Sequence, residues 1–353
     1  MEFSKQILNW YALHKRDFPW RRTKDPYKIW LSEIILQQTK TSQGLKFYLN
    51  FLKSFPTIEK LALANEEQVL KLWQGLGYYS RARNLHLSAK HIHYNLKGIF
   101  PNNYDELKKL KGVSPYTAAA ISSICFKEIR AAVDGNVYRI LARVFEVYTT
   151  INSANGIKYF QELANSLISI DAPGDYNQGL MDLGATICTP KKPRCECCPI
   201  ATKCISLKKR VTSMLPMKIK KIKIRTRYIS YFCINYNMHY LMKKRKGNDI
   251  WKNLYEFPSI ESKNQMKELS EKEQKKINLI LGHNNYSLIK SIRWKHKLSH
   301  QLLHITIHHI TTNKTANTTD YIKVNKKTLF ELPVPKPIEK FLKELDNILD
   351  DNV

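Results

Sequence analysis

The chain has 353 residues, of which 43% are hydrophobic, so it is long enough for two domains and apolar enough to exclude global disorder. Its 58 Lys and Arg against 30 Asp and Glu give a formal net charge of +28, which favours a polyanionic partner such as nucleic acid. A proteome-wide preference for lysine is the other explanation of this charge. The N-terminus has no long apolar h-region and no apolar run approaches about 18 residues, so we expect neither export nor membrane insertion, and therefore a reducing compartment.

Up to about residue 205, the spacing of apolar residues predicts helices. Apolar residues three and four positions apart are clearest in residues 57–73, 114–126 and 156–170. Turns that contain glycine, such as Asp134-Gly135, separate the helical segments. The N-terminal part is therefore predicted to be an all-α domain.

Two carboxylates stand out in this helical part. Glu33 lies in PYKIWLSEIILQQT among apolar neighbours, where it either reaches water at a helix edge or is desolvated with a raised pKa, fit to donate a proton. Asp134 lies in AAVDGNVYRILARVF, just before a helical stretch, where an aspartate commonly caps the helix. From these residues alone, both the structural and the catalytic interpretations remain open.

Residues 110–120, LKGVSPYTAAA, predict a hairpin between two helices. The turn contains Gly112, and the second helix begins near Ser114. Such a turn exposes backbone N–H groups at a helix N-terminus, where phosphate binds well. An ordinary hairpin of two helices has the same pattern.

Five of the seven cysteines lie within residues 188–204, CTPKKPRCECCPIATKC. Four of them have the spacing C-x6-C-x2-C-x5-C, and Cys197 is extra. Four thiolates in one loop form a tetrahedral sulfur site that suits zinc or an iron–sulfur cluster, and the spacing alone does not choose between them. The reducing compartment disfavours a disulfide knot. The four residues are Cys188, Cys195, Cys198 and Cys204.

Beyond the cysteine loop the chain changes character. From Cys197 to Asn248 there is no acidic residue, while Lys and Arg occur fourteen times. Residues 208–227, basic and containing proline, predict a linker. Strand-like runs rich in Ile, Tyr and Thr follow, and the chain closes with a proline-marked turn and a helix over 330–349. This part predicts a smaller α+β domain.

Several stretches occur in one order along the N-terminal part: DFPWRRTKDPYKIWLSEIILQQT, WQGLGYYSRARNL, LKGVSPYTA, VDGNVYRILAR, YNQGLMDLGATIC and the cysteine loop. Together they resemble the MutY-type adenine DNA glycosylases of the helix-hairpin-helix superfamily, over about residues 8–204. The C-terminal stretches NDIWKNLYEFPSI and WKHKLSHQLLHITI resemble that family's MutT-like (Nudix-like) domain. A β-rich domain of unrelated function is the alternative there.

The resemblance implies a multidomain protein. Residues 1–207 would form the all-α glycosylase domain, made of a six-helix barrel and an iron–sulfur subdomain. The loop 188–204 would hold a [4Fe–4S] cluster on the four spaced cysteines, with Cys197 as a bystander. After the linker 208–227, residues 228–353 would read the base opposite adenine. This domain lacks the G-x5-E-x7-R-E-x2-E-E box, so we do not expect it to hydrolyse nucleotides.

The resemblance also assigns the chemistry. Glu33 corresponds to the general acid and Asp134 to the catalytic aspartate, while Tyr116 and Asn136 are expected to orient Asp134 and the sugar. Related enzymes that cleave the strand have a lysine nucleophile at the position of Tyr116. A tyrosine there implies a monofunctional enzyme, which removes the base by flipping and acid-assisted hydrolysis.

Six residues are implied to bind DNA. Gln38 and Tyr78 would wedge into the base stack, although Tyr78 as core packing is the structural alternative. Gly112 and Ser114 belong to the hairpin, and Ser299 and His300 would contact 8-oxoguanine.

Three positions depart from the family pattern. Lys111 and Ser114 stand where Pro and Gly are usual, and Ser114 would be strained if its backbone needed positive φ. Leu298 replaces the usual Phe beside Ser299, which leaves the packing of that loop open.

The expected partner is duplex DNA with A·8-oxoguanine or A·G mispairs. The protein itself is expected to be a monomeric cytoplasmic enzyme of bacterial type, associated with the nucleoid. Three alternatives remain at this point: another helix-hairpin-helix glycosylase acting on thymine, uracil or oxidised pyrimidines, a non-catalytic iron–sulfur protein that binds DNA, and a zinc protein.

Overall fold

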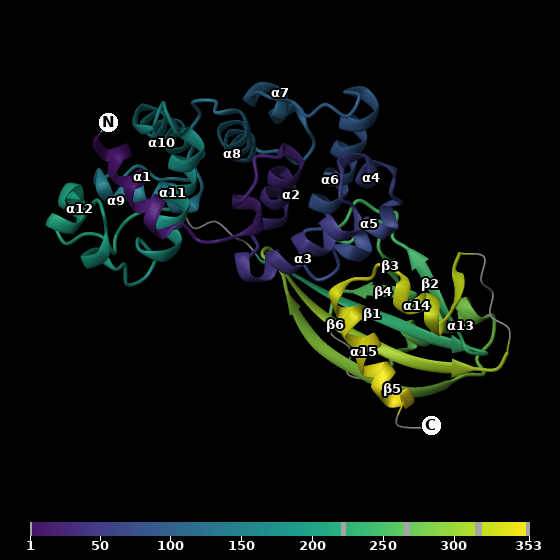
Figure 1. Ribbon diagram of the computed structural model, residues 1–353. Coiled ribbons are helices and arrows are strands. Elements are labelled where there is room, and N and C mark those ends of the chain that lie inside the picture. The colour runs from purple at the N-terminus through teal and green to yellow at the C-terminus, as the bar shows by residue number, and fades with distance from the viewer. Residues whose placement is uncertain (1, 220–223, 265–268, 315–319, 351–353) are drawn as a thin grey trace. The chain divides into compact units, whose positions relative to one another are not determined.

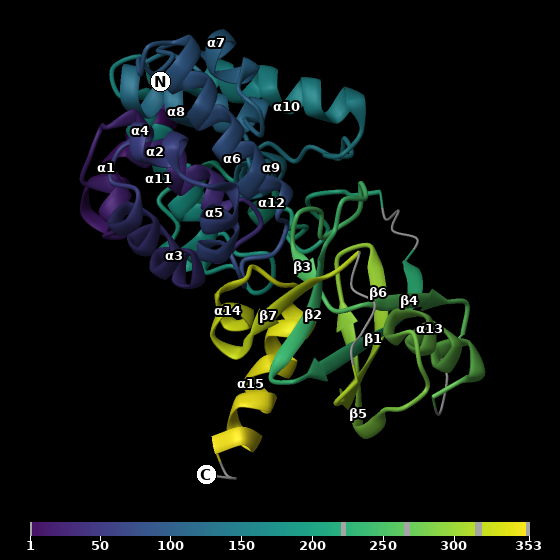
Figure 2. The same cartoon turned by 90° about the vertical axis from the view of Figure 1, so that its right-hand side faces the viewer.

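The computed structural model describes residues 2–219, 224–264, 269–314 and 320–350 (Figures 1 and 2). The chain divides by its internal contacts into unit 1, residues 1–63 and 84–220, and unit 2, residues 64–83 and 221–353. Part of the predicted linker, residues 220–223, lies outside the described residues. No helix among the described residues combines the length and the apolar character needed to cross a membrane.

Unit 1 is helical, as predicted, with short 3-10 turns at Pro19–Arg21, Cys195–Cys197 and Ala201–Lys203 and a π-helical turn at His91–Asn95. The helix α6 (Ser80–Lys90) begins in unit 2 and ends in unit 1. The other helices are α1 (Glu2–His14), α2 (Pro26–Leu36), α3 (Thr41–Ser54), α4 (Ile58–Leu63), α7 (Tyr104–Lys109), α8 (Pro115–Phe126), α9 (Gly135–Val144), α10 (Ala154–Leu167), α11 (Pro173–Thr186) and α12 (Ile205–Lys208).

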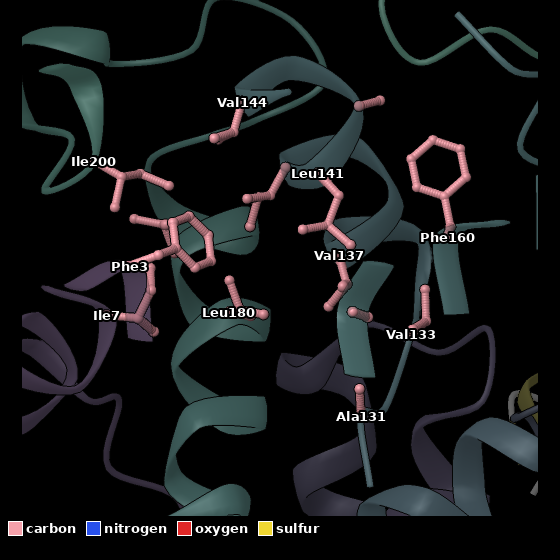
Figure 3. Packing of buried hydrophobic residues seen from close by; sticks show 14 of the residues in the cluster. Phe3, Ile7, Ala131, Val133, Val137, Leu141, Val144, Phe160, Leu180 and Ile200 are labelled. Carbon is pink, nitrogen blue, oxygen red and sulfur yellow. The ribbon is translucent and has the colours of Figure 1, made fainter. Parts of the chain in front are cut away.

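The N-terminal helix belongs to the core around α9 and α11. Phe3 and Ile7 of α1 pack in one buried cluster with Leu141 of α9 and Leu180 of α11 (Figure 3). Ile200, from the cysteine loop, joins the same cluster. The N-terminal helix and the cysteine loop therefore both pack in the same cluster as α9, the helix that follows Asp134.

The helical segment predicted over 57–73 is two helices, α4 and α5 (Glu66–Leu72). The side chain of Gln68 accepts a hydrogen bond from the Asn65 N–H at 3.2 Å, half of a capping box that starts a new helix. Helical periodicity continues across this point, so only the cap reveals the break. The boundary between the two units falls in the same place.

Unit 2 contains a mixed sheet with the strand order β3-β2-β1-β6-β5, with β4 paired to β1 and β7 to β2. The strands β1 and β6 run parallel, and the other pairs are antiparallel. The elements are β1 (Arg225–Tyr236), β2 (His239–Lys244), β3 (Tyr255–Glu256), β4 (Ser259–Ser262), α13 (Glu271–Leu281), β5 (Ser287–Lys297), β6 (Gln301–Thr312), β7 (Ile322–Asn325), α14 (Lys326–Glu331) and α15 (Lys336–Asp350).

The segment 64–83 is bound to the rest of unit 2 by specific polar contacts. Lys71 Nζ donates to the carbonyl oxygens of Phe330 and Leu332, at 2.5 and 3.0 Å. Glu67 accepts hydrogen bonds from Lys244 Nζ at 2.8 Å and from Tyr255 Oη at 2.7 Å. Tyr78, near the end of this segment, is thereby held in the same unit as the C-terminal sheet.

Candidate active site

A cavity of about 250 Å³ in unit 1 brings the predicted catalytic residues together. The helix α2 supplies Glu33, α8 supplies Tyr116, and the N-terminus of α9 supplies Asp134 and Asn136. Residues from three helices far apart in sequence therefore face one space large enough for a base.

Glu33 is half-buried on α2, between the buried Ser32 and Ile34. Burial raises its pKa to about 7, and the charge of Asp134 adds to this, while a hydrogen bond with Tyr116 and the charge of Arg21 oppose it. Of the two interpretations that the sequence left open, the structure has the desolvated one. Glu33 can therefore carry a proton near neutral pH.

Asp134 caps α9 and also faces the cavity. Its Oδ1 accepts the backbone N–H groups of Asn136 and Val137, each at 2.8 Å, and its Oδ2 accepts Asn136 Nδ2 at 2.7 Å. Burial raises the pKa of Asp134, and these three donors oppose the rise because they stabilise the carboxylate. The capping and catalytic interpretations of Asp134 are thus compatible.

Tyr116 contacts the other carboxylate. Its hydroxyl is hydrogen-bonded to Glu33 and lies 3.5 Å from Met181 Sδ, and burial raises its pKa well above the usual range. Its interaction with Asp134 is electrostatic. Tyr116 is therefore placed to orient Glu33 as well as to influence Asp134, whereas the resemblance implied a role toward Asp134 and the sugar.

A chain of hydrogen bonds leads from Asp134 to the cysteine loop. Asn136 Oδ1 accepts Arg139 Nη2 at 2.8 Å, and Arg139 Nε donates to the Cys188 carbonyl oxygen at 2.7 Å. The same Nη2 also donates to the Gly184 carbonyl oxygen at 2.8 Å. Arg139 follows Asn136 by three residues on α9, so helical spacing places both on one face, a signal that sequence reasoning passed over.

An ion-pair cluster that the sequence did not predict lies at another side of the cavity. Asp182 is fully buried. Its carboxylate accepts hydrogen bonds from both η-nitrogens of Arg21, and from Arg16 Nε at 2.7 Å. Arg21 lines the cavity and lowers the pKa of Glu33. These partners are more than 160 residues apart, so no local pattern could have paired them.

The four spaced cysteines line one small cavity together with Ile140, Arg143 and Ile200. Arg143 is 2% exposed, and its Nη1 donates to Cys188 Sγ at 3.4 Å and to the Thr189 carbonyl oxygen at 2.8 Å. Cys197 is exposed and lies outside the lining. Within the described residues, no three His, Cys, Asp or Glu side chains are placed to hold a single metal ion.

This donor set fits a cluster better than one ion. A single tetrahedral ion draws its four sulfurs close together, whereas in a four-iron cluster each thiolate binds a different iron and the sulfurs stay further apart. Here four cysteines line one cavity and Arg143 donates to Cys188 Sγ, a donor set that fits a group held by several thiolates.

The hairpin between α7 and α8 has the predicted form. Gly112 has φ +81°, which suits glycine, but Ser114 has φ −79° and is unstrained. Ser114 Oγ instead accepts the Thr117 N–H at 3.1 Å and caps α8. The strain considered for Ser114 is therefore absent. Gln37 Nε2, from the end of α2, donates to the Gly112 carbonyl oxygen at 3.3 Å.

Both predicted wedge residues have left-handed backbone conformations. Gln38 has φ 56° and is exposed, and Tyr78 has φ 48° and is 40% exposed. Such values are uncommon outside glycine and persist where surrounding structure holds them. The exposure of Tyr78 contradicts plain core packing.

Ser299 and His300 form the exposed tip of the turn between β5 and β6 in unit 2. Leu298 is half-buried, and its N–H donates to the Gln301 carbonyl oxygen at 2.8 Å, which closes the turn. Ser299 Oγ shares a hydrogen bond with the Tyr78 hydroxyl. The turn is thus regular with leucine in place of the usual phenylalanine.

Comparison with known proteins identifies the two domains. Residues 31–166 match the model of the HhH-GPD superfamily base excision DNA repair proteins, and residues 230–344 match the NUDIX domain. These matches confirm the predicted fold class, a helical glycosylase domain followed by a Nudix-like domain.

The adenine DNA glycosylase of Buchnera aphidicola subsp. Schizaphis graminum is 34% identical over 345 residues, which cover 96% of this chain and 97% of the relative. The human adenine DNA glycosylase is 40% identical over 57% of this chain and 39% of its own length. Among solved structures, a thermostable thymine-DNA glycosylase superposes with a TM-score of 0.55 at 33% identity, over 59% of this chain and 96% of that one. With similarity to the Buchnera protein along almost its whole length, the chain belongs to the adenine DNA glycosylase family.

Proposed function

We propose that the protein removes adenine that is mispaired with 8-oxoguanine or guanine in duplex DNA, by flipping the adenine out and hydrolysing its N-glycosidic bond. The observation that carries the proposal is the cavity shared by two unlike carboxyls. Glu33 has a pKa of about 7, and Asp134 accepts three N–H donors. One proton-carrying and one ionised carboxyl are what acid-assisted cleavage of a glycosidic bond needs.

In this proposal Glu33 transfers its proton to N7 of the flipped adenine. The bond between C1′ and N9 then breaks, its electron pair leaves with the base, and positive charge develops on the sugar. Asp134 stabilises that charge until water adds to C1′, and the proton that water loses returns to the Glu33 carboxylate. Asn136 holds the Asp134 carboxylate, and Tyr116 holds Glu33.

A tyrosine at position 116 has no amine, so this residue cannot form a Schiff base with the sugar. The protein is therefore proposed to be monofunctional, leaving an abasic site in an intact strand. We assign the chemistry to the catalytic residues within 1–207, and the reading of the opposite base to Ser299 and His300 of residues 228–353. Gln38 and Tyr78 are proposed to wedge into the base stack.

We further propose that Cys188, Cys195, Cys198 and Cys204 hold a [4Fe–4S] cluster. With all ligands supplied by protein thiolates, such a cluster has no open position for substrate and supplies structural constraint to the loop. Arg139 and Arg143 link this loop to α9, directly behind Asp134. Iron and sulfide analysis of the purified protein tests this assignment, and zinc in place of iron would refute it.

The partner is proposed to be duplex DNA carrying A·8-oxoguanine or A·G. We also propose that the protein acts on the nucleoid of a bacterial-type cytoplasm. One chain contributes both carboxyls and the four cysteines, so a monomer suffices. The similarity to a thymine-DNA glycosylase structure makes thymine removal from T·G pairs the competing activity.

A single-turnover assay tests the proposal. Duplexes with A opposite 8-oxoguanine, G or T, and with T opposite G, are treated with and without alkali after the reaction. We expect release of adenine first opposite 8-oxoguanine and strand breaks only after alkali. Glu33→Gln and Asp134→Asn should each abolish release but retain binding to the mismatch. Thymine release, or binding without any turnover, would contradict the proposal.

A further inference from the structure

A buried arginine in unit 2 is hydrogen-bonded to two segments that border a cavity of about 400 Å³. One wall contains Asp249 and Trp251, and the other is the turn from His296 to His300. Tyr78 lines the cavity as well, and it is bonded to Ser299 at the tip of the turn. Arg227, on β1 and 7% exposed, is bonded to Asp249 of the first wall and to Gln301, the residue that follows the second wall.

All five N–H donors of Arg227 are used. Nε and Nη2 donate to the two carboxylate oxygens of Glu261 at 2.8 and 2.7 Å. Nη1 and Nη2 donate to the two oxygens of Asp249 at 3.1 and 2.9 Å. The remaining donor of Nη1 reaches Gln301 Oε1 at 3.2 Å. A guanidinium with every donor engaged in forked geometry has little freedom to move.

Asp249, the partner in the first wall, is held from a second side. Arg245 Nη2 donates to its Oδ2 at 2.8 Å, and the Ile250 N–H donates to its Oδ1 at 2.7 Å. Burial alone would raise the pKa of Asp249, but these cations and donors lower it, so the carboxylate stays ionised and its pairs persist at neutral pH.

Gln301 directly follows the turn that forms the second wall, and it closes that turn. Its carbonyl oxygen accepts the Leu298 N–H at 2.8 Å, and the preceding carbonyl oxygen, of His300, accepts the Arg225 N–H at 3.1 Å. Ser299 lies two residues before Gln301. The turn that carries Ser299 is therefore bonded to Arg225 of β1, and the Arg227 guanidinium links it to Asp249, two residues from Trp251.

We infer that Arg227 is a positioning residue that sets the preference for 8-oxoguanine over guanine as the base opposite adenine. This inference rests on the proposed function. The two bases differ at C8, which carries a carbonyl oxygen in the oxidised base, and at N7, which there becomes a donor. A hydroxyl distinguishes them only if it is held in place, because hydrogen bonds weaken steeply with distance and angle.

Recognition and chemistry depend on residues of different units. Glu33 and Asp134 belong to unit 1, whereas Arg227 and its partners Glu261, Asp249 and Gln301 belong to unit 2. Loosening Arg227 should therefore leave adenine release opposite guanine unchanged and lower release opposite 8-oxoguanine. A purely structural role would lower both equally.

The test uses the full chain with Arg227→Lys, which keeps the charge but cannot form the two forked pairs. Single-turnover rates are measured on A·8-oxoG and A·G duplexes, and affinities on the same duplexes with a non-hydrolysable adenosine. We expect the ratio of the two rates, and of the two affinities, to fall about tenfold, the effect of roughly one well-placed hydrogen bond. Arg293→Lys, at an exposed arginine on β5, is the matched control and should change neither ratio.

Gln301→Ala removes the link to the turn while leaving both ion pairs of Arg227 in place, so it keeps the test valid if Arg227→Lys does not fold. It should lower the same ratios. Unchanged ratios in a folded variant, or equal losses on both duplexes, would overturn the inference, as would a wild-type protein without preference. If the wild-type protein released no adenine at all, the proposed function would fail, and the affinity ratios would still decide the role of Arg227.

Discussion

The hydroxyl of Tyr78 and the Oγ of Ser299 share a hydrogen bond, although 221 residues separate them in sequence. One belongs to the segment 64–83 and the other to the turn between β5 and β6, and both line one cavity of unit 2. The residue proposed to wedge into the base stack is thus bonded to the residue proposed to read the base opposite adenine.

This contact predicts coupled effects of Tyr78→Phe and Ser299→Ala. Each change alone removes the shared hydrogen bond. Either substitution should therefore lower the affinity for an A·8-oxoG duplex less in the other variant than in the wild-type protein, with a coupling energy of about 1 kcal/mol. Fluorescence anisotropy with a non-hydrolysable adenosine measures all four affinities of the cycle. Strictly additive losses would show that the two hydroxyls act independently on DNA.

Adenine release should depend on pH through Glu33. Because its pKa is about 7 and its protonated form is the active one, the single-turnover rate should fall above pH 7 by about tenfold per pH unit. At low pH the rate should fall again as Asp134, whose pKa is also raised, becomes protonated. The two carboxyls interact, so the apparent pKa values belong to the pair. A rate that rises steadily with pH would contradict the role of Glu33 as the acid.

Glu33 should also make the folded protein less stable at high pH. Its pKa is near 4.5 unfolded and about 7 folded, so the stability that Glu33 contributes is complete below about pH 4.5 and is lost as pH rises through 7. Glu33→Gln should therefore raise the free energy of unfolding at pH 8 by on the order of 2 kcal/mol, and by much less at pH 5. Urea unfolding at both pH values measures the difference, and a pH-independent gain would be the contrary result.

Gly184→Ala should impair chemistry by displacing Asn136. A Cβ at residue 184 would lie 2.4 Å from Asn136 Cβ, so Asn136 must move, and with it the hydrogen bond to Asp134. A displacement of this size can cost on the order of 100-fold in rate. Single-turnover release on A·8-oxoG measures it. Gly247→Ala, where a Cβ meets nothing within 4 Å, is the control, and an unchanged rate in a folded Gly184→Ala protein would contradict the positioning role of Asn136.

The cysteine loop offers a matched pair of variants one residue apart. Cys198→Ser should lose iron, lower the melting temperature by on the order of 10 °C, and weaken DNA binding, because the loop and α9 lose a shared support. Cys197→Ser, at an exposed cysteine outside the cavity, should retain iron and stability. Iron analysis and thermal unfolding of both proteins make the comparison. Equal iron loss in the two variants would show that Cys197 is a ligand.

Much of the site could be predicted because its signals are local. The cap at Asp134, the apolar neighbours of Glu33, the turn at Gly112 and the spacing of the cysteines each depend on a few adjacent residues. The sequence by itself therefore determined the helical and strand-containing parts, the candidate carboxyls and the candidate ligands. The sequence also showed that Ser114 departs from the glycine usual at this position of the family pattern, but the structure shows an unstrained backbone there, with φ −79°.

Only the tertiary structure decided which residues share an environment. The pKa of Glu33 depends on burial and on Asp134, Tyr116 and Arg21, which come from separate elements. Likewise, Arg21 with Asp182, Tyr78 with Ser299 and Arg227 with Gln301 are pairs far apart in the chain. Desolvation and ion pairing act through space, at distances of a few ångströms, and the folded packing alone brings such groups that close.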